Sequence, residues 1–399
     1  MYGKCYKRIN VFMKTLMIIV PSLEGGGQEK VSTITGKVLG DMYKIVFVIF
    51  TDKNAKYETT NVWKFINLGI PAYNDIIRKI VSVFLKTLKI RKLKKQYRVS
   101  ATISFGRPAN VVNCLSKYRD KIICSIRNSS FLETQKHNYI NKLIYLTSDS
   151  IVFLSEGQRL LTVRAFPEIK GKNCVIYNPC DMDLVSKRSD EETDMPWKEG
   201  RILVSCGRLE SVKCFINLCN AFSLAKQRCS DIKLLIMGEG SLKDHIENHI
   251  KELGLEEDIK LIGFVDNPYK YLSKCTLFVF STSREGFANV IIDALACGLP
   301  VISTDHHFGA REILAGNFAY ITNDSYTLEE YGILTPCFEE GNDNQLKKEK
   351  IFADAIIRIL SDDKLLSLYR NKARSRSMDF GLKEYEDKWI SELTKQLEQ

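Results

Sequence analysis

Short apolar runs alternate along the chain with longer amphipathic segments. In the first half, the runs at 16–20, 44–50, 101–105, 122–125 and 150–154 indicate buried strands. The second half repeats the pattern at 202–206, 233–237, 260–263, 277–280 and 300–304. Strands that alternate with helices are typical of βαβ units, which build parallel sheets. The pattern predicts an α/β protein with two doubly wound parallel sheets.

The chain of 399 residues is long enough for two or three domains, each with its own core. Residues 175–181 and the acidic stretch that follows, as far as Pro196, have the composition of a linker. We therefore place a Rossmann-like domain at 1–178 and a second one at 179–380. The segment 381–399 has a helical pattern and forms a third, short unit.

The most informative stretch runs from Glu285 to Asp293 and follows the predicted strand Leu277–Phe280. Ligands of open α/β sheets bind beyond the carboxyl ends of the strands. The N-terminus of the helix that begins here offers unpaired N–H groups to a phosphate. The two carboxylates, eight positions apart, can only accept hydrogen bonds and suit hydroxyl groups. A phosphate between hydroxyl-bearing groups describes a nucleotide-sugar.

This stretch resembles the E-x7-E region of the retaining glycosyltransferases of family 4, which have the GT-B fold of two Rossmann-like domains facing a cleft. Further ordered landmarks of the family match at 21–29, 204–209, 235–240 and 261–266. One position departs, because Asp293 stands where the family has Glu. In the resembled family, a C-terminal helix packs back on the first domain.

The resemblance implies a role for each donor-site residue. Glu285 would bind the ring hydroxyls of the donor sugar and Asp293 the ribose hydroxyls. Phe264 and Val265 would lie beside the base. The backbone amides of the helix start would face sugar and phosphate; they belong to Phe287, Ala288, Asn289 and Val290. The structural alternative for Glu285 is an acid that merely stabilises a helix N-terminus through the helix dipole.

Cationic and glycine-rich positions complete the predicted catalytic site. Arg208 and Lys213 follow a strand and could neutralise the charge that develops on a leaving phosphate. Gly26 and Gly27, with Gly25, follow the first strand and could approach the donor diphosphate. The resemblance places Arg127, next to Asn128, on the acceptor side, about where related enzymes present a polar residue to the reacting sugar. The alternatives are solvated surface cations and a plain strand–helix turn.

A metal site is not expected. Asp181 and Asp183 have a D-x-D spacing but lie in the linker, and His245 and His249 lack a third ligand nearby. The twelve cysteines have no zinc spacing, which favours a reducing compartment. We therefore expect no cofactor and no metal, and the resemblance implies a UDP-sugar as co-substrate.

Positive charge is concentrated in the first half. Residues 1–178 carry 30 Lys and Arg against 11 acids, and residues 179–399 carry 28 against 37. The segment 76–98 alone has nine cations and no acid, with an apolar stripe at Ile77, Ile80, Val81, Phe84 and Leu88. Such a helix can lie on an anionic membrane. The predicted membrane-facing cations are Arg78, Lys79, Lys86, Lys89, Lys92 and Lys95.

The alternative for this segment is an ordinary helix whose stripe packs on the sheet. Its aromatic residues are too few for the stacking platforms of a nucleic-acid-binding surface, so no nucleic-acid partner is expected. No run approaches the ~20 apolar residues that span a bilayer. We expect a cytoplasmic protein, peripheral on the inner face of the cell membrane.

Together with the resemblance, these features predict a retaining glycosyltransferase. It would move a sugar, with a hexosamine such as GalNAc or GlcNAc as the best candidate, from a UDP-sugar to a lipid-linked undecaprenyl-diphosphate glycan in bacterial polysaccharide (O-antigen, capsule or glycan) synthesis. The hexosamine rests on resemblance at 267–272 and 309–313. The alternatives are a non-catalytic nucleotide-sugar-binding module and a hexosyltransferase with a soluble acceptor.

Overall fold

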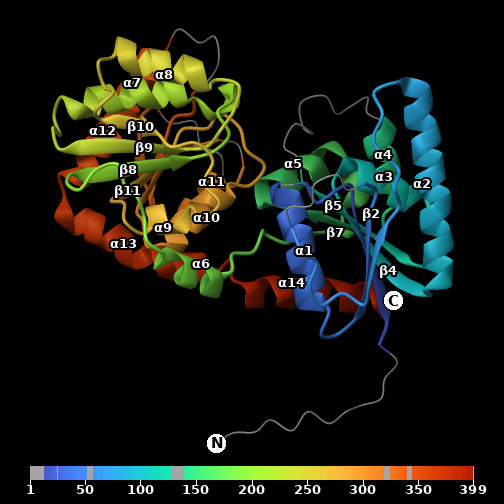
Figure 1. Cartoon of the computed structure of the whole chain (residues 1–399). Coiled ribbons are helices and arrows are strands. Elements are labelled where there is room, and N and C mark those ends of the chain that lie inside the picture. The colour runs from blue at the N-terminus through green and yellow to red at the C-terminus, as the bar shows by residue number, and fades with distance from the viewer. Residues whose placement is uncertain are drawn as a thin grey trace, which may run out of the picture.

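The computed structural model describes residues 13–24, 26–51, 57–127, 139–306, 308–318, 324–338 and 344–398. Figure 1 shows two lobes, each built around a sheet with helices on both faces. Gly25 and Asn128 lie outside the described residues.

The first lobe contains a seven-stranded parallel sheet with the order β3-β2-β1-β4-β5-β6-β7. Its strands are β1 (Thr15–Val20), β2 (Lys44–Ile49), β3 (Lys64–Asn67), β4 (Val99–Phe105), β5 (Lys121–Ile126), β6 (Ser150–Phe153) and β7 (Asn173–Val175). Its helices are α1 (Gly27–Leu39), α2 (Ile76–Gln96), α3 (Arg107–Leu115), α4 (Tyr139–Thr147) and α5 (Glu156–Ala165), with a 3-10 turn at Pro167–Ile169.

The second lobe contains a seven-stranded sheet with the order β10-β9-β8-β11-β12-β14-β13, parallel except for the edge strand β13. Its strands are β8 (Arg201–Cys206), β9 (Ile232–Met237), β10 (Ile259–Leu261), β11 (Leu277–Phe280), β12 (Val301–Thr304), β13 (Thr327–Leu328) and β14 (Ile333–Thr335). Its helices are α6 (Met182–Ser189), α7 (Phe215–Lys226), α8 (Lys243–Glu252), α9 (Tyr269–Leu272), α10 (Asn289–Ala296), α11 (Ala310–Leu314), α12 (Gln345–Leu360) and α13 (Asp363–Met378), with a 3-10 turn at Ser211–Lys213.

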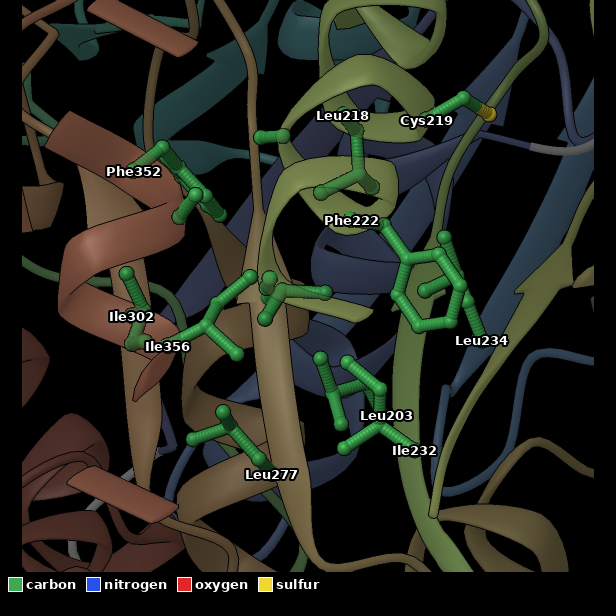
Figure 2. Close-up of a cluster of buried hydrophobic side chains, with 14 of the residues drawn as sticks. Leu203, Leu218, Cys219, Phe222, Ile232, Leu234, Leu277, Ile302, Phe352 and Ile356 are labelled. Atoms are coloured by element: carbon green, nitrogen blue, oxygen red, sulfur yellow. The ribbon is translucent and has the colours of Figure 1, made fainter. Parts of the chain in front are cut away.

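Each lobe has its own hydrophobic core, as expected for a doubly wound sheet. In the second lobe, side chains from α7 and α12 pack on one face of the central strands (Figure 2). A separate cluster covers the other face, where α10 and α13 lie. Burial on both faces explains why the central strands are continuous apolar runs in the sequence.

The last helix, α14 (Leu382–Leu397), returns to the first lobe (Figure 1). Tyr385, Trp389 and Leu393 are buried in the first-lobe core beside α1. The Tyr385 hydroxyl also forms a 2.7 Å hydrogen bond with Thr35 Oγ1. The predicted two-domain α/β fold with a returning terminal helix is therefore confirmed.

The strands that the pattern did not predict are β3, β7, β13 and β14. β3, β7 and β13 have two to four residues with partly or fully exposed side chains, and all three are edge strands. An edge strand needs no continuous apolar run because one or both of its faces meet solvent. β14 is buried but has only three residues.

Candidate active site

The predicted site residues of the second lobe gather beyond the carboxyl ends of β8 and β11. Lys213 ends the 3-10 turn that follows β8, and Glu285 lies in the loop between β11 and α10. Their side chains form a partly buried ion pair. The Lys213 ammonium also lies 5.0 Å from the centre of the Phe280 ring. Lys213 is thus held by a carboxylate and an aromatic face at the edge of the sheet.

The turn that carries Lys213 is sharply bent. Cys214, which links the 3-10 turn to α7, has φ 52° in the left-handed region. Such a conformation costs a non-glycine residue on the order of 1 kcal/mol or more. The neighbouring strand ends also approach closely, because a Cβ at Gly238 would lie 1.9 Å from the Gly207 carbonyl oxygen. Glycine at position 238 therefore lets the loops after β8 and β9 lie side by side.

Arg208 does not join the ion pair between Lys213 and Glu285. Its guanidinium bonds to Glu210 at 2.8 Å, and 77% of its side chain is exposed. Phe264 is also largely exposed, whereas Val265 packs against the second-lobe core. The structure therefore fixes Lys213 and Glu285 together, and leaves Arg208 and Phe264 at the surface.

Asp293, on α10, is enclosed by polar neighbours. Its Oδ1 accepts a 3.2 Å hydrogen bond from the Tyr269 hydroxyl and a longer one from the Cys180 thiol. Burial raises the pKa of Asp293, and the positive charge of Lys30 on α1 opposes that shift. Lys30 belongs to the other lobe, so the electrostatics of this carboxylate depend on both lobes.

The start of α10 faces the start of α1 across the lobes. A Cβ at Gly27 would lie 3.5 Å from Asn289 Nδ2, so the glycine loop of the first lobe abuts the first residue of α10. Gly26 precedes α1 and supplies no side-chain cap. Phe287 and Ala288 are buried and Val290 is half-buried. Two helix N-termini therefore approach each other at the junction, an arrangement that suits an anion.

Arg127 reaches the same junction from the end of β5. Its guanidinium donates a hydrogen bond to Asn178 Oδ1, and Asn178 Nδ2 donates to Asn289 Oδ1 at 2.8 Å. The guanidinium also lies 4.9 Å from the centre of the Phe105 ring. Desolvation lowers the pKa of Arg127, and the nearby Tyr385 hydroxyl opposes that shift. Arg127 is thus linked through Asn178 to the helix that follows Glu285.

A buried carboxylate connects the lobes at a second point. Glu312 on α11 accepts hydrogen bonds from the backbone N–H groups of Glu156 (2.8 Å) and Gly157 (2.9 Å) at the start of α5. It also accepts a 3.1 Å bond from the Tyr177 hydroxyl. Burial raises the pKa of Glu312, although these donors oppose the shift. A second-lobe side chain therefore caps a first-lobe helix.

Four further residues at these contacts were not predicted from the sequence: Lys30, Asn178, Tyr269 and Glu312. Tyr269 and Glu312 belong to the two stretches, 267–272 and 309–313, whose resemblance had suggested a hexosamine. Lys30 lies in the first turn of α1, three positions after Gly27. Its closeness to the glycine loop is a signal in the sequence that could have identified it. Nothing in the local pattern marks Asn178, because its role depends on contacts between the lobes.

The residues whose spacing resembles that of metal ligands have ordinary structural partners. Asp181 caps α6 by accepting from the Leu184 N–H, and His249 bonds to Asn220. Within the described residues, no three His, Cys, Asp or Glu side chains gather closely enough to hold a metal ion. The described cysteines are free thiols.

The basic helix α2 exposes its apolar face, whereas an ordinary amphipathic helix of a globular protein buries that face. Its apolar stripe faces solvent, with Ile77 73% and Phe84 60% exposed. The face toward the sheet carries Ser82, Lys86, Ile90 and Lys94. The alternative in which the stripe packs on the sheet is therefore wrong. None of the helices in the described part of the chain has the length and apolar character needed to cross a bilayer.

The prediction for Lys86 as a membrane-facing cation is also wrong. Lys86 is 7% exposed, and its ammonium donates to the Pro71 carbonyl at 3.3 Å and lies over the Phe50 ring. Burial lowers its pKa. The helix turns it inward because positions 82, 86, 90 and 94 share one face. Arg78, Lys79, Lys92 and Lys95 are exposed; Lys89 is exposed but bonds to the Leu68 carbonyl.

The two lobes have the architecture of the GT-B fold, and comparisons with known proteins show that the class is a glycosyltransferase. Residues 188–330 match the family described as glycosyl transferases group 1. A Campylobacter jejuni protein, the N-acetylgalactosamine-N,N'-diacetylbacillosaminyl-diphospho-undecaprenol 4-alpha-N-acetylgalactosaminyltransferase, is 30% identical over 92% of this chain and 96% of its own length. The chain therefore belongs to the group 1 glycosyltransferases and is an enzyme of this class.

Further relatives share the whole length. A second Campylobacter jejuni enzyme, a GalNAc-alpha-(1->4)-GalNAc-alpha-(1->3)-diNAcBac-PP-undecaprenol alpha-1,4-N-acetyl-D-galactosaminyltransferase, is 22% identical over 95% of this chain and 98% of its own. Among solved structures, the Anabaena protein Alr3699/HepE in complex with UDP superposes with a TM-score of 0.76 at 18% identity, covering 96% of this chain and all of that one. The structural match confirms the GT-B fold.

Proposed function

We propose that this enzyme transfers a hexosamine, with retention of anomeric configuration, from a UDP-sugar to a glycan carried on undecaprenyl diphosphate. The observation that carries the proposal is the ion pair of Lys213 and Glu285 at the carboxyl edge of the second sheet. A nucleotide-sugar carries a diphosphate and hydroxyl groups, which are the natural partners of an ammonium and a carboxylate. In the structure, the two side chains pair with each other.

The donor would exchange that ion pair for two contacts of its own. Lys213 would pair with the diphosphate and neutralise the charge that builds on the leaving oxygen. Glu285 would accept hydrogen bonds from the sugar hydroxyls. The amides at the starts of α1 and α10 would add donors to the same phosphates. Because fixed cations and amides supply this stabilisation, we propose that the reaction needs no divalent metal.

Retention requires the acceptor hydroxyl to attack on the face that the diphosphate leaves. The leaving phosphate oxygen would then take the acceptor proton, and the protein supplies orientation and exclusion of water. Arg127 lies on the first-lobe side of the junction, where it would hold the acceptor end of this arrangement.

The lipid-linked acceptor is supported by the exposed stripe of α2. Ile76, Ile77, Ile80, Val81, Phe84, Leu85 and Leu88 form a continuous apolar surface, and exposed cations lie beside it. Apolar side chains flanked by Lys and Arg insert into the interface of an anionic bilayer. We propose that α2 holds the enzyme on the inner face of the cell membrane. Both named Campylobacter relatives carry undecaprenol in the names of their substrates.

A transfer assay tests this function. The enzyme would be incubated with radiolabelled UDP-GalNAc or UDP-GlcNAc and an undecaprenyl-diphosphate glycan, and the organic phase counted. We expect label in the lipid fraction and an α-linkage, by NMR, from an α-linked donor. Label transferred only to a soluble sugar would favour a soluble acceptor. Tight binding of UDP without any transfer would contradict the proposed function.

A further inference from the structure

The loop that leaves β11 holds the turn that carries Lys213. Ser281 Oγ donates a 2.7 Å hydrogen bond to the backbone carbonyl of Lys213 itself. The preceding carbonyl, that of Val212, accepts bonds from Thr282 Oγ1 (3.0 Å), from Ser283 Oγ (3.1 Å) and from the Ser283 backbone N–H (2.8 Å). Two successive carbonyls of one short turn are therefore bonded to three successive residues of another loop.

The same loop also sets the place of Glu285. Only three residues, 282 to 284, separate Ser281 from Glu285. The carboxylate and the ammonium of the ion pair are thus fixed from one segment: Glu285 through the chain, and Lys213 through the Ser281 hydroxyl. Ser281 is 1% exposed, so its bond does not compete with solvent.

We infer that Ser281 is a positioning residue for the transfer reaction, which sets the distance of the Lys213 ammonium from Glu285 and from the leaving phosphate. This inference rests on the proposed function of Lys213. Misplacing a catalytic group by about 1 Å can cost roughly a hundredfold in rate. The strained Cys214 directly after Lys213 makes such a displacement easy, because the turn relaxes if its outer bonds are removed.

Ser283 supplies a matched control. Its hydroxyl also bonds to the turn, but the Val212 carbonyl keeps the Ser283 N–H and Thr282 Oγ1 as donors when that hydroxyl is removed. The Lys213 carbonyl, in contrast, accepts from the Ser281 hydroxyl, which reaches it from another loop. Ser281→Ala and Ser283→Ala each delete one buried or part-buried hydroxyl. A difference in kcat between the two variants therefore reflects where the hydroxyl bonds to the turn, because the chemical change is the same.

The test is a double-mutant cycle between Ser281→Ala and Lys213→Ala, read as kcat and KM for donor turnover. We expect Lys213→Ala to lower kcat about a hundredfold, as removal of one charge-stabilising donor does. Ser281→Ala should lower kcat roughly three- to tenfold, the range that one hydrogen bond is worth, with little change in KM. In the Lys213→Ala background, Ser281→Ala should have less than about a twofold further effect.

Ser283→Ala should change kcat by less than about twofold, the effect of a substitution whose bond is duplicated. Should Ser281→Ala fail to fold, Ser281→Cys retains the volume with a weaker donor and should give an intermediate loss. Independent, multiplying effects of Ser281→Ala and Lys213→Ala would overturn the positioning role. A wild-type enzyme with no donor turnover would instead overturn the proposed function, and the inference with it.

Discussion

Lys213 and Glu285 form an ion pair although 72 positions separate them in the chain. The pair joins the loops after two neighbouring strands, β8 and β11, which are adjacent and parallel in the sheet. Parallel neighbours place their carboxyl ends at one edge, so the pairing follows from the order of the strands. It leaves a cation and a carboxylate together at the edge where ligands of this fold bind.

Replacing Glu285 with Gln should lower turnover at least about tenfold, because it removes the charge that sugar hydroxyls bond to and leaves Lys213 without its partner. Glu285→Ala should do at least as much. Initial rates at saturating donor measure the effect, and an unchanged melting temperature shows that the fold is intact. Activity close to that of the wild type would remove the role assigned to this carboxylate.

Removing divalent metals should leave the rate unchanged. If Lys213 and the helix amides neutralise the leaving phosphate, then treatment with EDTA followed by assay in metal-free buffer should change kcat by less than about twofold. The control restores Mg²⁺ or Mn²⁺ to the treated enzyme. Loss of activity on chelation, with recovery on addition of either ion, would contradict metal-independent transfer.

The double variant Ile80→Ser and Phe84→Ser should weaken binding to vesicles of phosphatidylethanolamine and phosphatidylglycerol. Each fully buried side chain of this size contributes about 1.5–3 kcal/mol, so partial insertion of both predicts at least a tenfold lower partition coefficient. The matched control is Leu346→Ser with Leu368→Ser, which changes two exposed leucines of the second lobe. Equal sedimentation of the two double variants would contradict docking through α2.

Lys86 is a poor position for a charge-reversal test of membrane binding. Its side chain is buried and bonded to Pro71, so Lys86→Glu would bury a new carboxylate and destabilise the first lobe. Arg78→Glu and Lys79→Glu, both on exposed positions of α2, test the electrostatic contribution. Their effect on vesicle binding should shrink as salt rises, since salt screens exposed charges.

The Glu312 cap between the lobes should make stability depend on pH. Burial raises the pKa of Glu312 in the folded chain above that in the unfolded chain, so the folded state binds more protons. The protonated Glu312 carboxyl therefore contributes fully to the free energy of unfolding at pH values below its pKa in the unfolded chain. This contribution is lost as pH rises through its pKa in the folded chain. Glu312→Gln removes this titration.

As pH rises from about 4 to 7, the free energy of unfolding of the wild type should therefore fall relative to that of Glu312→Gln. Urea unfolding of both proteins at several pH values measures it. A matched control is Glu330→Gln, since Glu330 is an exposed acid of the same lobe. A difference that stays constant with pH, or moves the other way, would contradict the raised pKa.

The sequence predicted the architecture well because the central strands are buried on both faces and must be apolar. β1, β8 and β11 show this directly, since their residues are almost fully buried. The short strands β3 and β13 escaped because an edge strand needs little apolar surface. Lys213 and Glu285 each follow a predicted strand, so their sequence positions placed them at the carboxyl edge of the second sheet, and the resemblance supplied their predicted roles.

The direction in which a helix face or a side chain points was harder to predict than the position of the element that carries it. The apolar stripe of α2 was evident from its spacing, but whether it met the sheet or solvent depended on Lys94, which pairs with the buried Asp120 at 2.9 Å. A lysine on the inner face is unexpected unless its partner is known. Asn178 escaped for a related reason, because its partners Arg127 and Asn289 belong to different lobes.

Donor turnover and its dependence on Lys213 can be measured most directly as release of UDP from a panel of UDP-sugars in the presence of an undecaprenyl-diphosphate glycan. We expect the wild type to turn over a UDP-hexosamine, and we expect Lys213→Ala to abolish most of this release while UDP still binds. Turnover that is unaffected by Lys213→Ala, or the absence of release from every UDP-sugar, would contradict this expectation.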